Sequence, residues 1–542
     1  MTLILGGGHT VRLLLTVLWS AALSLAQTAD DQGFTARLEK MREASYMEKV
    51  TIAEQLAQTN HPAVRATLTA LIEDRLAYRN SDHRMFVLKL ADQDPLILID
   101  PVTMKESGTG PAVDFTTIGT NNALRGALRT TLAQYSLGDK DEAVRLEAVR
   151  EMALHIGAAN AARLRDRERM EKSPTVRSEL AIALALYDLD TGDSAARKEA
   201  VVALKRSLRG TVRNRLGRVA EEDSDAAVKS AAREAIGWID LWRKFYSGIE
   251  MLFFGISMGS VLVLIATGLA ITFGVVRVLN MAHGELMMLG AYTTYVIQTA
   301  MPNYIGVSTL VSIPAAFMVS AAVGVLMERC IIRHLYGRPL ETLLATFGVG
   351  LILQQAVRSL FTSLNRSVST PQWMSGSLVI NDALSVTYNR LYIVLFSFLV
   401  FMAVRLILNR TRLGLRIRAV SENRSMAKAM GVRTEWVDAI SFGLGSGIAG
   451  VAGVALSQLT NVGPNLGQSH IIDSFMVVVF GGVGSLWGAL IGGLSMGIGS
   501  NLLQPFLGDV LAKIVVLIAI ILFIQARPRG LFPQTGRSAE DK

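Results

Sequence analysis

The chain has 542 residues, of which 51% are hydrophobic and 18% are charged, and its formal net charge is +9. It is too long for one ordinary domain and too apolar for an ordinary soluble protein. The positive charge does not indicate a nucleic-acid partner, because many basic residues lie in short loops between apolar segments, where they set membrane topology.

Residues 1–26 are typical of a secretory signal peptide. His9 and Arg12 precede an apolar run from Leu13 to Leu25, and small residues precede a cleavage point after Ala26. An uncleaved anchor helix is the alternative, but the run is shorter than the roughly 20 residues that a spanning helix needs. In either case, the segment that follows is expected to be exported.

Residues 27–245 are rich in charge and are expected to form an exported helical domain. A short phrase with valine followed by a cation recurs at 61–65, 141–145, 173–177 and 225–229. Each phrase begins with a residue suited to start a helix, and the repetition resembles HEAT-type helical repeats, which stack to bury their apolar faces. Prolines and glycines interrupt the pattern between Leu96 and Asn122, where we expect a short hairpin or a packed loop. No catalytic constellation stands out, so a binding or docking module is the favoured interpretation.

Residues 246–535 are expected to form a membrane domain, followed by a cytoplasmic tail, 536–542. Long apolar runs in lipid should be helices, because every backbone polar group must be satisfied internally. The predicted fold class is therefore all-α, a polytopic membrane helix bundle preceded by an exported HEAT-like repeat domain. Glycines in small-xxx-small patterns should let the helices pack closely. The expected spanning segments lie near 249–273, 283–300, 305–327, 340–361, 391–408, 438–458, 471–484, 486–503 and 510–526, with a glycine-rich boundary at 480–488 that suits a broken or re-entrant helix.

The arginine-rich loops give an orientation for these segments. Such loops follow the third, fifth and ninth segments, and the positive-inside rule places them in the cytoplasm. A chain that starts outside is again inside after three, five and nine crossings. The N-terminal domain is therefore expected in the periplasm and the C-terminus in the cytoplasm.

The connection between the first two segments carries a distinctive phrase. From Phe273 to Tyr292 it reads Phe-Gly-Val-Val-Arg-Val-Leu-Asn-Met-Ala-His-Gly-Glu-Leu-Met-Met-Leu-Gly-Ala-Tyr. It closely resembles the signature of the branched-chain amino-acid permease family, the LivH type. The resemblance continues through 334–348, 480–488 and 527–532, and the large exported extension resembles the urea-importer branch of that family.

The basic loop after the fifth segment is a candidate docking element. Ser421 can cap a short helix that ends at Gly431, a residue suited to the left-handed turn after a helix. Ala427 and Gly431 resemble the end of the coupling motif of ABC-importer permeases, although Ser425 and Met426 replace its Glu-Ala. The alternative is a loop that only fixes topology. The residues expected to couple to ATPases are Ser421, Glu422, Ala427 and Gly431.

The resemblance implies a permease subunit in the bacterial inner (plasma) membrane, with no catalytic residue, metal or cofactor of its own. It would pair with a second permease subunit, two cytoplasmic ABC ATPases and a periplasmic substrate-binding protein. The chain contains no Gly-Lys-Ser or Gly-Lys-Thr, so its ATP site would lie on other chains. We expect it to translocate urea by alternating access.

Two rival functions stay open. The same machine could carry a branched-chain amino acid, whose zwitterion would favour charged residues or half-helix ends at the membrane midplane. A secondary transporter or channel without ATPases would be supported by internal inverted repeats.

Polar residues inside the expected spans give the candidate substrate pathway. Polar groups at membrane depth are expensive and usually face a bundle interior or a water-filled path. Amide, hydroxyl and carboxylate groups would suit urea, which is neutral and rich in donors and acceptors. The alternative role is hydrogen bonding between helices. The predicted pathway consists of Asn280, His283, Glu285, Thr342, Thr346, Gln354, Gln355 and Asp473.

Overall fold

The computed structural model describes residues 31–532, except 60, 91–93, 155 and 277. The expected signal peptide, 1–26, and cytoplasmic tail, 536–542, lie outside the described residues. The chain divides into two compact units, Met1–Ile239 and Asp240–Lys542, which are described separately.

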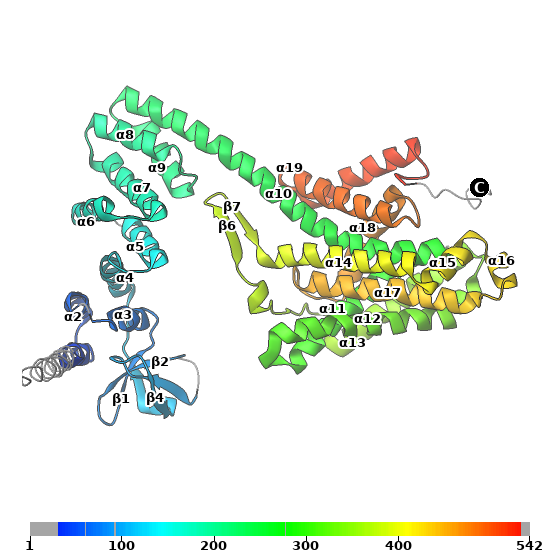
Figure 1. Ribbon diagram of the computed structural model, residues 1–542, viewed down its shortest axis with the longest axis horizontal. Helices are drawn as coiled ribbons and strands as arrows, with labels where there is room; N and C mark the ends of the chain where they lie inside the picture. Colours follow the sequence, from blue (N-terminus) through cyan, green and yellow to red (C-terminus); the bar gives the residue numbers. More distant parts are fainter. Residues whose placement is uncertain (1–30, 60, 91–93, 155, 277, 533–542) are drawn as a thin grey trace, which may run out of the picture. The chain divides into compact units, whose positions relative to one another are not determined.

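The first unit begins with helices and a small sheet (Figure 1). A helical stretch, 31–40, is followed by α2 (Tyr46–Gln58) and α3 (Val64–Ile72). An antiparallel sheet comes next, with strand order β4-β3-β2-β1-β5. Its strands are β1 (Leu76–Arg79), β2 (Met85–Leu88), β3 (Leu96–Ile99), β4 (Glu106–Gly110) and β5 (Phe115–Thr117), with the 3-10 turn η1 (Ala112–Asp114) before β5.

This sheet corrects the expectation that the exported domain is helical outside Leu96–Asn122. The short hairpin expected there is present as β3 and β4, but the sheet already begins at Leu76. Side chains alternate along β2: Met85 and Val87 join the core formed with the helices, while Phe86 and Leu88 join a second core on the other face. This is the period of a strand with both faces covered, and four residues are too few to reveal it in sequence.

The rest of this unit is helical, and the recurring phrases start its helices as expected. In each phrase the first side chain accepts a hydrogen bond from a backbone N–H two or three residues later; these residues are His61, Asp141, Ser173 and Asp225. The HEAT-type assignment itself stays a prediction. The helices are α4 (Asn122–Ser136), α5 (Glu142–Leu154), α6 (Ala158–Met170), α7 (Pro174–Thr191), α8 (Ser194–Leu204), α9 (Gly210–Glu222) and the start of α10 (Ala226–Val276).

The second unit is a helix bundle. Within the described residues, 6 helices are long and apolar enough to cross a membrane: α10, α12, α13, α14, α17 and α19. The helix α18 is apolar but shorter. The elements are α11 (His283–Ala300), η2 (Pro302–Tyr304), α12 (Ile305–Cys330), η3 (Ile332–Leu335), α13 (Pro339–Phe361), η4 (Gln372–Met374), β6 (Ser377–Asn381), β7 (Leu384–Thr387), α14 (Tyr388–Arg410), α15 (Arg412–Glu422), α16 (Arg424–Ala429), α17 (Thr434–Ser457), α18 (Leu466–Gly481) and α19 (Leu486–Ala526).

Two breaks near the C-terminal end of the bundle fall where the sequence predicted segment boundaries. The boundary at 480–488 is a turn between α18 and α19, in which Gly482 and Gly484 have positive φ. The α19 helix breaks at Gly508, which has φ 77° and ψ 169° and divides it into two arms. These arms correspond to the expected segments 486–503 and 510–526.

The helix α17 forms the centre of the bundle, packed between α11 and α12 (Figure 1). The glycines of α17 allow α11 and α12 to approach it closely. A Cβ at Gly450 would lie 2.6 Å from the carbonyl oxygen of Ala316, and one at Gly453 would lie 2.1 Å from that of Met287. At Gly453 the two backbones are therefore in direct contact, and at Gly450 only the small side chain of Ser320 lies closer than the backbone, as the small-xxx-small patterns predict.

Candidate functional site

The helix α11 begins deep inside the bundle. The Nε2 atom of His283, its first residue, lies 3.0 Å from the carbonyl oxygen of Ile265. Ile265 precedes the end of α10 at Val276 by 11 residues, or about 16 Å at 1.5 Å per residue. The chain therefore leaves the end of α10, returns as a non-helical segment through 278–282, and starts a new helix well inside the unit.

One face of α13 lies against this start. Its buried residues Thr342, Thr346, Gly350 and Gln354 recur every four positions, a spacing that places them on the same side of a helix. The hydroxyl of Thr346 accepts a hydrogen bond from the backbone N–H of Met281 at 3.1 Å. At Gly350, the middle residue of α13, a Cβ would lie 3.5 Å from Cγ of Glu285.

The start of α18 meets the same face. Asn465 immediately precedes α18, and its Oδ1 accepts hydrogen bonds from Gln354 Nε2 at 3.1 Å and from Arg358 Nη2 at 2.8 Å. Gly467 packs directly on Gly284, so the N-terminal ends of α11 and α18 lie together. We call this cluster the polar seam; its members are Asn280, Glu285, Thr346, Gln354, Arg358 and Asn465.

The polar seam contains buried polar atoms that lack partners. Asn280 is fully buried, and its Oδ1 accepts from the N–H of Ala282 at 3.1 Å, but its Nδ2 has no hydrogen-bond partner among the described residues. Glu285 is 7% exposed, and its Oε2 is likewise without a partner in that part of the chain. Because buried polar groups are nearly always paired, each of these two atoms is a position at which a polar ligand would be stabilised.

The other predicted pathway residues lie outside the polar seam. His283 faces α10, and Thr342 donates within its own first turn to the carbonyl of Arg338 at 2.9 Å. Gln355 is exposed on the opposite side of α13 from the seam. Asp473 is half-buried on α18, and its charged neighbours include Lys513 on α19.

The basic loop after α14 forms two helices, α15 and α16, instead of one. Ser421 lies in the last turn of α15, where its hydroxyl donates to the carbonyl of Gly274 at 3.1 Å. The expectation that Ser421 caps the short helix is wrong, because the chain leaves helical geometry at Asn423, whose side chain caps α16 through the N–H of Met426 at 2.9 Å. Gly431 has φ +82°, which confirms the left-handed turn after α16.

The side chains around α16 divide into buried and exposed sets. Ala427 is 5% exposed and packs into the core, whereas Glu422 is exposed. Met426 and Met430 are 61% and 78% exposed. Exposed apolar side chains on a short helix suit a docking surface, since they lose unfavourable contact with water when a partner covers them.

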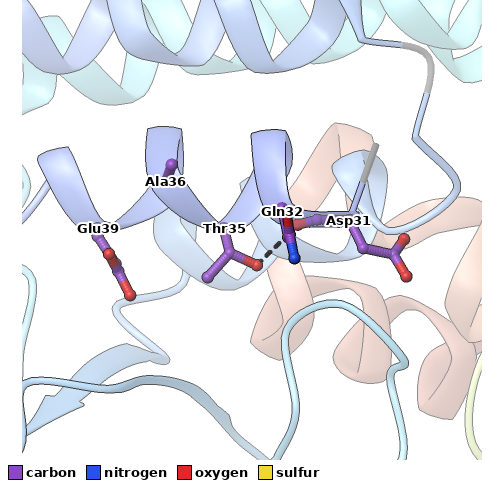
Figure 2. Close-up of a pocket in the computed structure, with 5 residues that line it drawn as sticks. All are labelled: Asp31, Gln32, Thr35, Ala36 and Glu39. Atoms are coloured by element: carbon purple, nitrogen blue, oxygen red, sulfur yellow. Dashed lines mark hydrogen bonds between the residues drawn. The ribbon is translucent and has the colours of Figure 1, made fainter. Parts of the chain in front are cut away.

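A shallow pocket in the first unit has fewer buried, unpaired polar groups to offer a ligand than the polar seam (Figure 2). It is lined by Asp31, Gln32, Thr35, Ala36 and Glu39, which all lie on the helical stretch 31–40. The Thr35 hydroxyl donates to the carbonyl of Asp31 at 2.8 Å, so it is satisfied locally. In the described part of the chain, no group of three or more His, Cys, Asp or Glu residues could hold a metal ion.

The family is decided by comparison with known proteins. The family model described as "Branched-chain amino acid transport system / permease component" matches residues 251–524. The chain belongs to this permease family. Relatives include the high-affinity branched-chain amino acid transport system permease proteins LivH of Escherichia coli K12, 30% identical over 299 residues, and BraD of Pseudomonas aeruginosa, 29% identical over 298. Each alignment covers 53% of this chain and 96% of the relative.

More distant relatives extend the comparison. A probable LivH permease of Methanocaldococcus jannaschii is 29% identical over 296 residues, which are 52% of this chain and 92% of that protein. The ribose import permease RbsC of E. coli K12 is 27% identical over 232 residues, or 40% and 70%. No solved structure gives a significant match. The family expected from the Phe273–Tyr292 phrase is therefore confirmed, and the match places the polar seam and α16 inside the permease domain.

Sequence reasoning missed Arg358 and Asn465. Arg358 was detectable, since a charge in an otherwise apolar segment is itself a functional signal. Asn465 lies in a loop, 107 residues from the arginine that it contacts, and nothing local in the sequence connects the two.

Proposed function

We propose that this chain is the membrane-spanning permease subunit of an ATP-driven importer, and that its cargo is a branched-chain amino acid or a closely similar zwitterion. Membership of the permease family supports the first part, and the names of the LivH and BraD relatives support the second. The observation that carries the cargo assignment is the presence of opposite charges, Glu285 and Arg358, in the polar seam. This favours the amino-acid alternative over the urea expected from the sequence.

The geometry of the polar seam suits a zwitterion. Arg358 lies eight residues beyond Gly350, which contacts Glu285, a separation of about 12 Å along α13. Two long side chains and a small zwitterion between them bridge such a gap. The free oxygen of Glu285 would accept the ammonium group, and the guanidinium of Arg358 would hold the carboxylate by charge-assisted hydrogen bonds.

The half-helix ends strengthen the same interpretation. The N-terminal ends of α11 and α18 meet at the seam, and each helix N-terminus carries a partial positive charge that favours an anionic group. Transporters use broken helices at the midplane in this way, because their exposed backbone groups replace the water of a polar substrate. Charged side chains and helix ends, the two features expected for a zwitterion, thus both support this proposal.

The proposed function also implies partner proteins and an orientation in the membrane. As a multi-pass protein of the bacterial inner membrane, it would work with a second permease subunit, two cytoplasmic ATPases that dock on α16, and a periplasmic substrate-binding protein. The first unit would then lie in the periplasm and the C-terminus in the cytoplasm. The wide apolar exposure of α13 and α19, whose most apolar windows are 28% and 17% buried, suits contact with lipid or the second permease.

The test compares uptake of labelled leucine and labelled urea in cells lacking this chain and complemented with variants. The wild type and Gln355→Ala, on the exposed side of α13, should restore leucine uptake. Glu285→Gln and Arg358→Gln should each lower it at least tenfold at unchanged protein levels. Recovery of urea uptake without leucine uptake would refute the amino-acid assignment.

Urea stays a second candidate because two observations favour it. Most members of the polar seam are neutral amides or hydroxyls, namely Asn280, Thr346, Gln354 and Asn465. The first unit also lies outside the residues that match the family model. If urea is the cargo, Glu285→Gln should leave its uptake nearly unchanged, since a neutral amide can still accept its hydrogen bonds.

A further inference from the structure

An ion pair with a buried carboxylate joins the short helix α16 to the neighbouring helix α17. The guanidinium of Arg424, the first residue of α16, pairs with the carboxylate of Asp438 in the second turn of α17. Asp438 is 0% exposed, whereas the Arg424 side chain is 42% exposed. The pair therefore connects a group inside the membrane domain with a helix on its surface.

The same arginine also reaches the end of α12. Its guanidinium lies 4.9 Å from the ring centroid of Tyr336, in the loop between α12 and α13. The Tyr336 hydroxyl donates to Glu328 Oε1 at 2.8 Å, and Glu328, in the last turn of α12, is 2% exposed. Arg424 is thus the common neighbour of residues that connect α16 with both α12 and α17.

We propose that Arg424, Asp438, Tyr336 and Glu328 form a coupling latch, through which movement of α16 is transmitted to α12 and α17. This inference rests on the proposed function as an ATP-driven importer. The physical reason is the buried carboxylate of Asp438, whose Oδ1 has no hydrogen-bond partner within the described residues. If α16 moved away alone, that buried charge would lose its counter-ion, which is strongly unfavourable in the interior. The two helices must therefore move together.

Besides Ala427, which packs into the core, the latch attaches α16 to the bundle. A pocket of about 490 Å³ separates α16 from the end of α12, lined among others by Glu328, Arg424, Ser425 and Lys428, so this side of α16 is not packed against the bundle. A second ion pair at its edge, Arg333 with Glu435 at 3.0 Å, has side chains 34% and 67% exposed. Exposed pairs of this kind contribute little, which makes Arg333 a matched control.

The experiment uses the complete importer, purified through a tag on this chain and reconstituted in proteoliposomes. Substrate uptake and ATP hydrolysis are measured on the same samples. Arg424→Gln should lower uptake at least tenfold while ATP hydrolysis and the amount of co-purified ATPase stay within twofold of wild type. Arg424→Lys, which keeps the charge, should recover part of the uptake, and Arg333→Gln should match the wild type in all three measurements.

A double variant distinguishes transmission from simple destabilisation. Arg424→Gln with Asp438→Asn removes both charges, so it should regain the thermal stability lost in the single variant but not its uptake. Recovery of uptake together with stability would overturn the latch. If Arg424→Gln transports as fast as the wild type, the latch is refuted but the proposed function is not. If the wild type itself shows no ATP-dependent uptake, the proposed function is refuted and the latch with it.

Discussion

Replacing Gly290 with alanine should force α11 away from α17. A Cβ at this position would lie 2.0 Å from the carbonyl oxygen of Gly450 and 2.5 Å from its Cα. Ordinary contact begins near 3.4 Å, so the two backbones must separate by about 1.4 Å, the difference from 2.0 Å. Neither side can relieve the clash by a rotamer change, because both contacts are with backbone atoms.

The cost follows from overpacking a tight crossing. Added carbon atoms in a well-packed core typically cost about 1–3 kcal/mol, which lowers the melting temperature of a large domain by roughly 2–12 °C. Gly348→Ala is the matched control, since a Cβ there meets nothing within 4 Å. In α13 that change replaces a poor helix former with the best one and should be neutral or stabilising, by up to about 1 kcal/mol.

The assay is thermal unfolding of the purified chain in one detergent at one scan rate, because unfolding of such proteins is commonly irreversible and rate-dependent. Gly290→Ala should melt below wild type and Gly348→Ala at or above it. Equal melting of the two variants would refute the argument, since they make the same chemical change and differ only in the space around it.

Two further predictions concern a titration and the turn after α16. Burial opposes ionisation of Glu171, but hydrogen bonds from Arg145, the backbone of Ser173 and Arg167 outweigh it and lower the pKa of Glu171 from 4.5 to about 2. The ionised carboxylate contributes about 3 kcal/mol to the free energy of unfolding; this contribution is complete above about pH 4.5 and is lost as the pH falls towards 2. In Glu171→Gln, the protection of α6 and α7 against hydrogen exchange should therefore depend less on pH below pH 5 than in the wild type. Gly431→Arg should abolish uptake and leave membrane insertion intact, since the space around Gly431 is open but its φ of +82° is strained for arginine. Normal uptake by this variant would contradict the prediction.

The helices were predictable because their signals are local. Apolar runs long enough to cross a membrane can be recognised from composition alone. The phrases at 141–145 and 173–177 contain the residues that cap the helices they begin. The sheet between Leu76 and Thr117 was largely missed, since its strands are only three to five residues long and depend on partners elsewhere in the chain. The domain boundary predicted from composition near residue 245 was not visible as a break in secondary structure, because α10 continues through this region as one helix of 51 residues.

The candidate site was predictable in part. Asn280, Glu285, Thr346 and Gln354 stood out as polar groups in apolar surroundings. The structure places Thr346 and Gln354 on one face of α13, with Glu285 beside Gly350 and Asn280 next to Met281, whose N–H binds Thr346. The sequence could not separate them from Gln355, because neighbouring residues point to different sides of a helix and only the fold decides which side is buried. Their connection through Asn465 was equally hidden, since it depends on where α18 begins.

The glycines of α17 give the polar seam and the coupling latch a common element. Asp438, the latch residue of α17, lies 12 residues before Gly450, the glycine that contacts α11 at Gly290. Because these contacts are between backbones, no side chain can absorb a displacement by changing its rotamer. Under the proposed coupling, a movement of α17 that begins at the latch would displace α11, whose first turn carries Glu285. Larger residues at the crossing would place adjustable side chains between the helices, and glycine keeps the two backbones in direct contact.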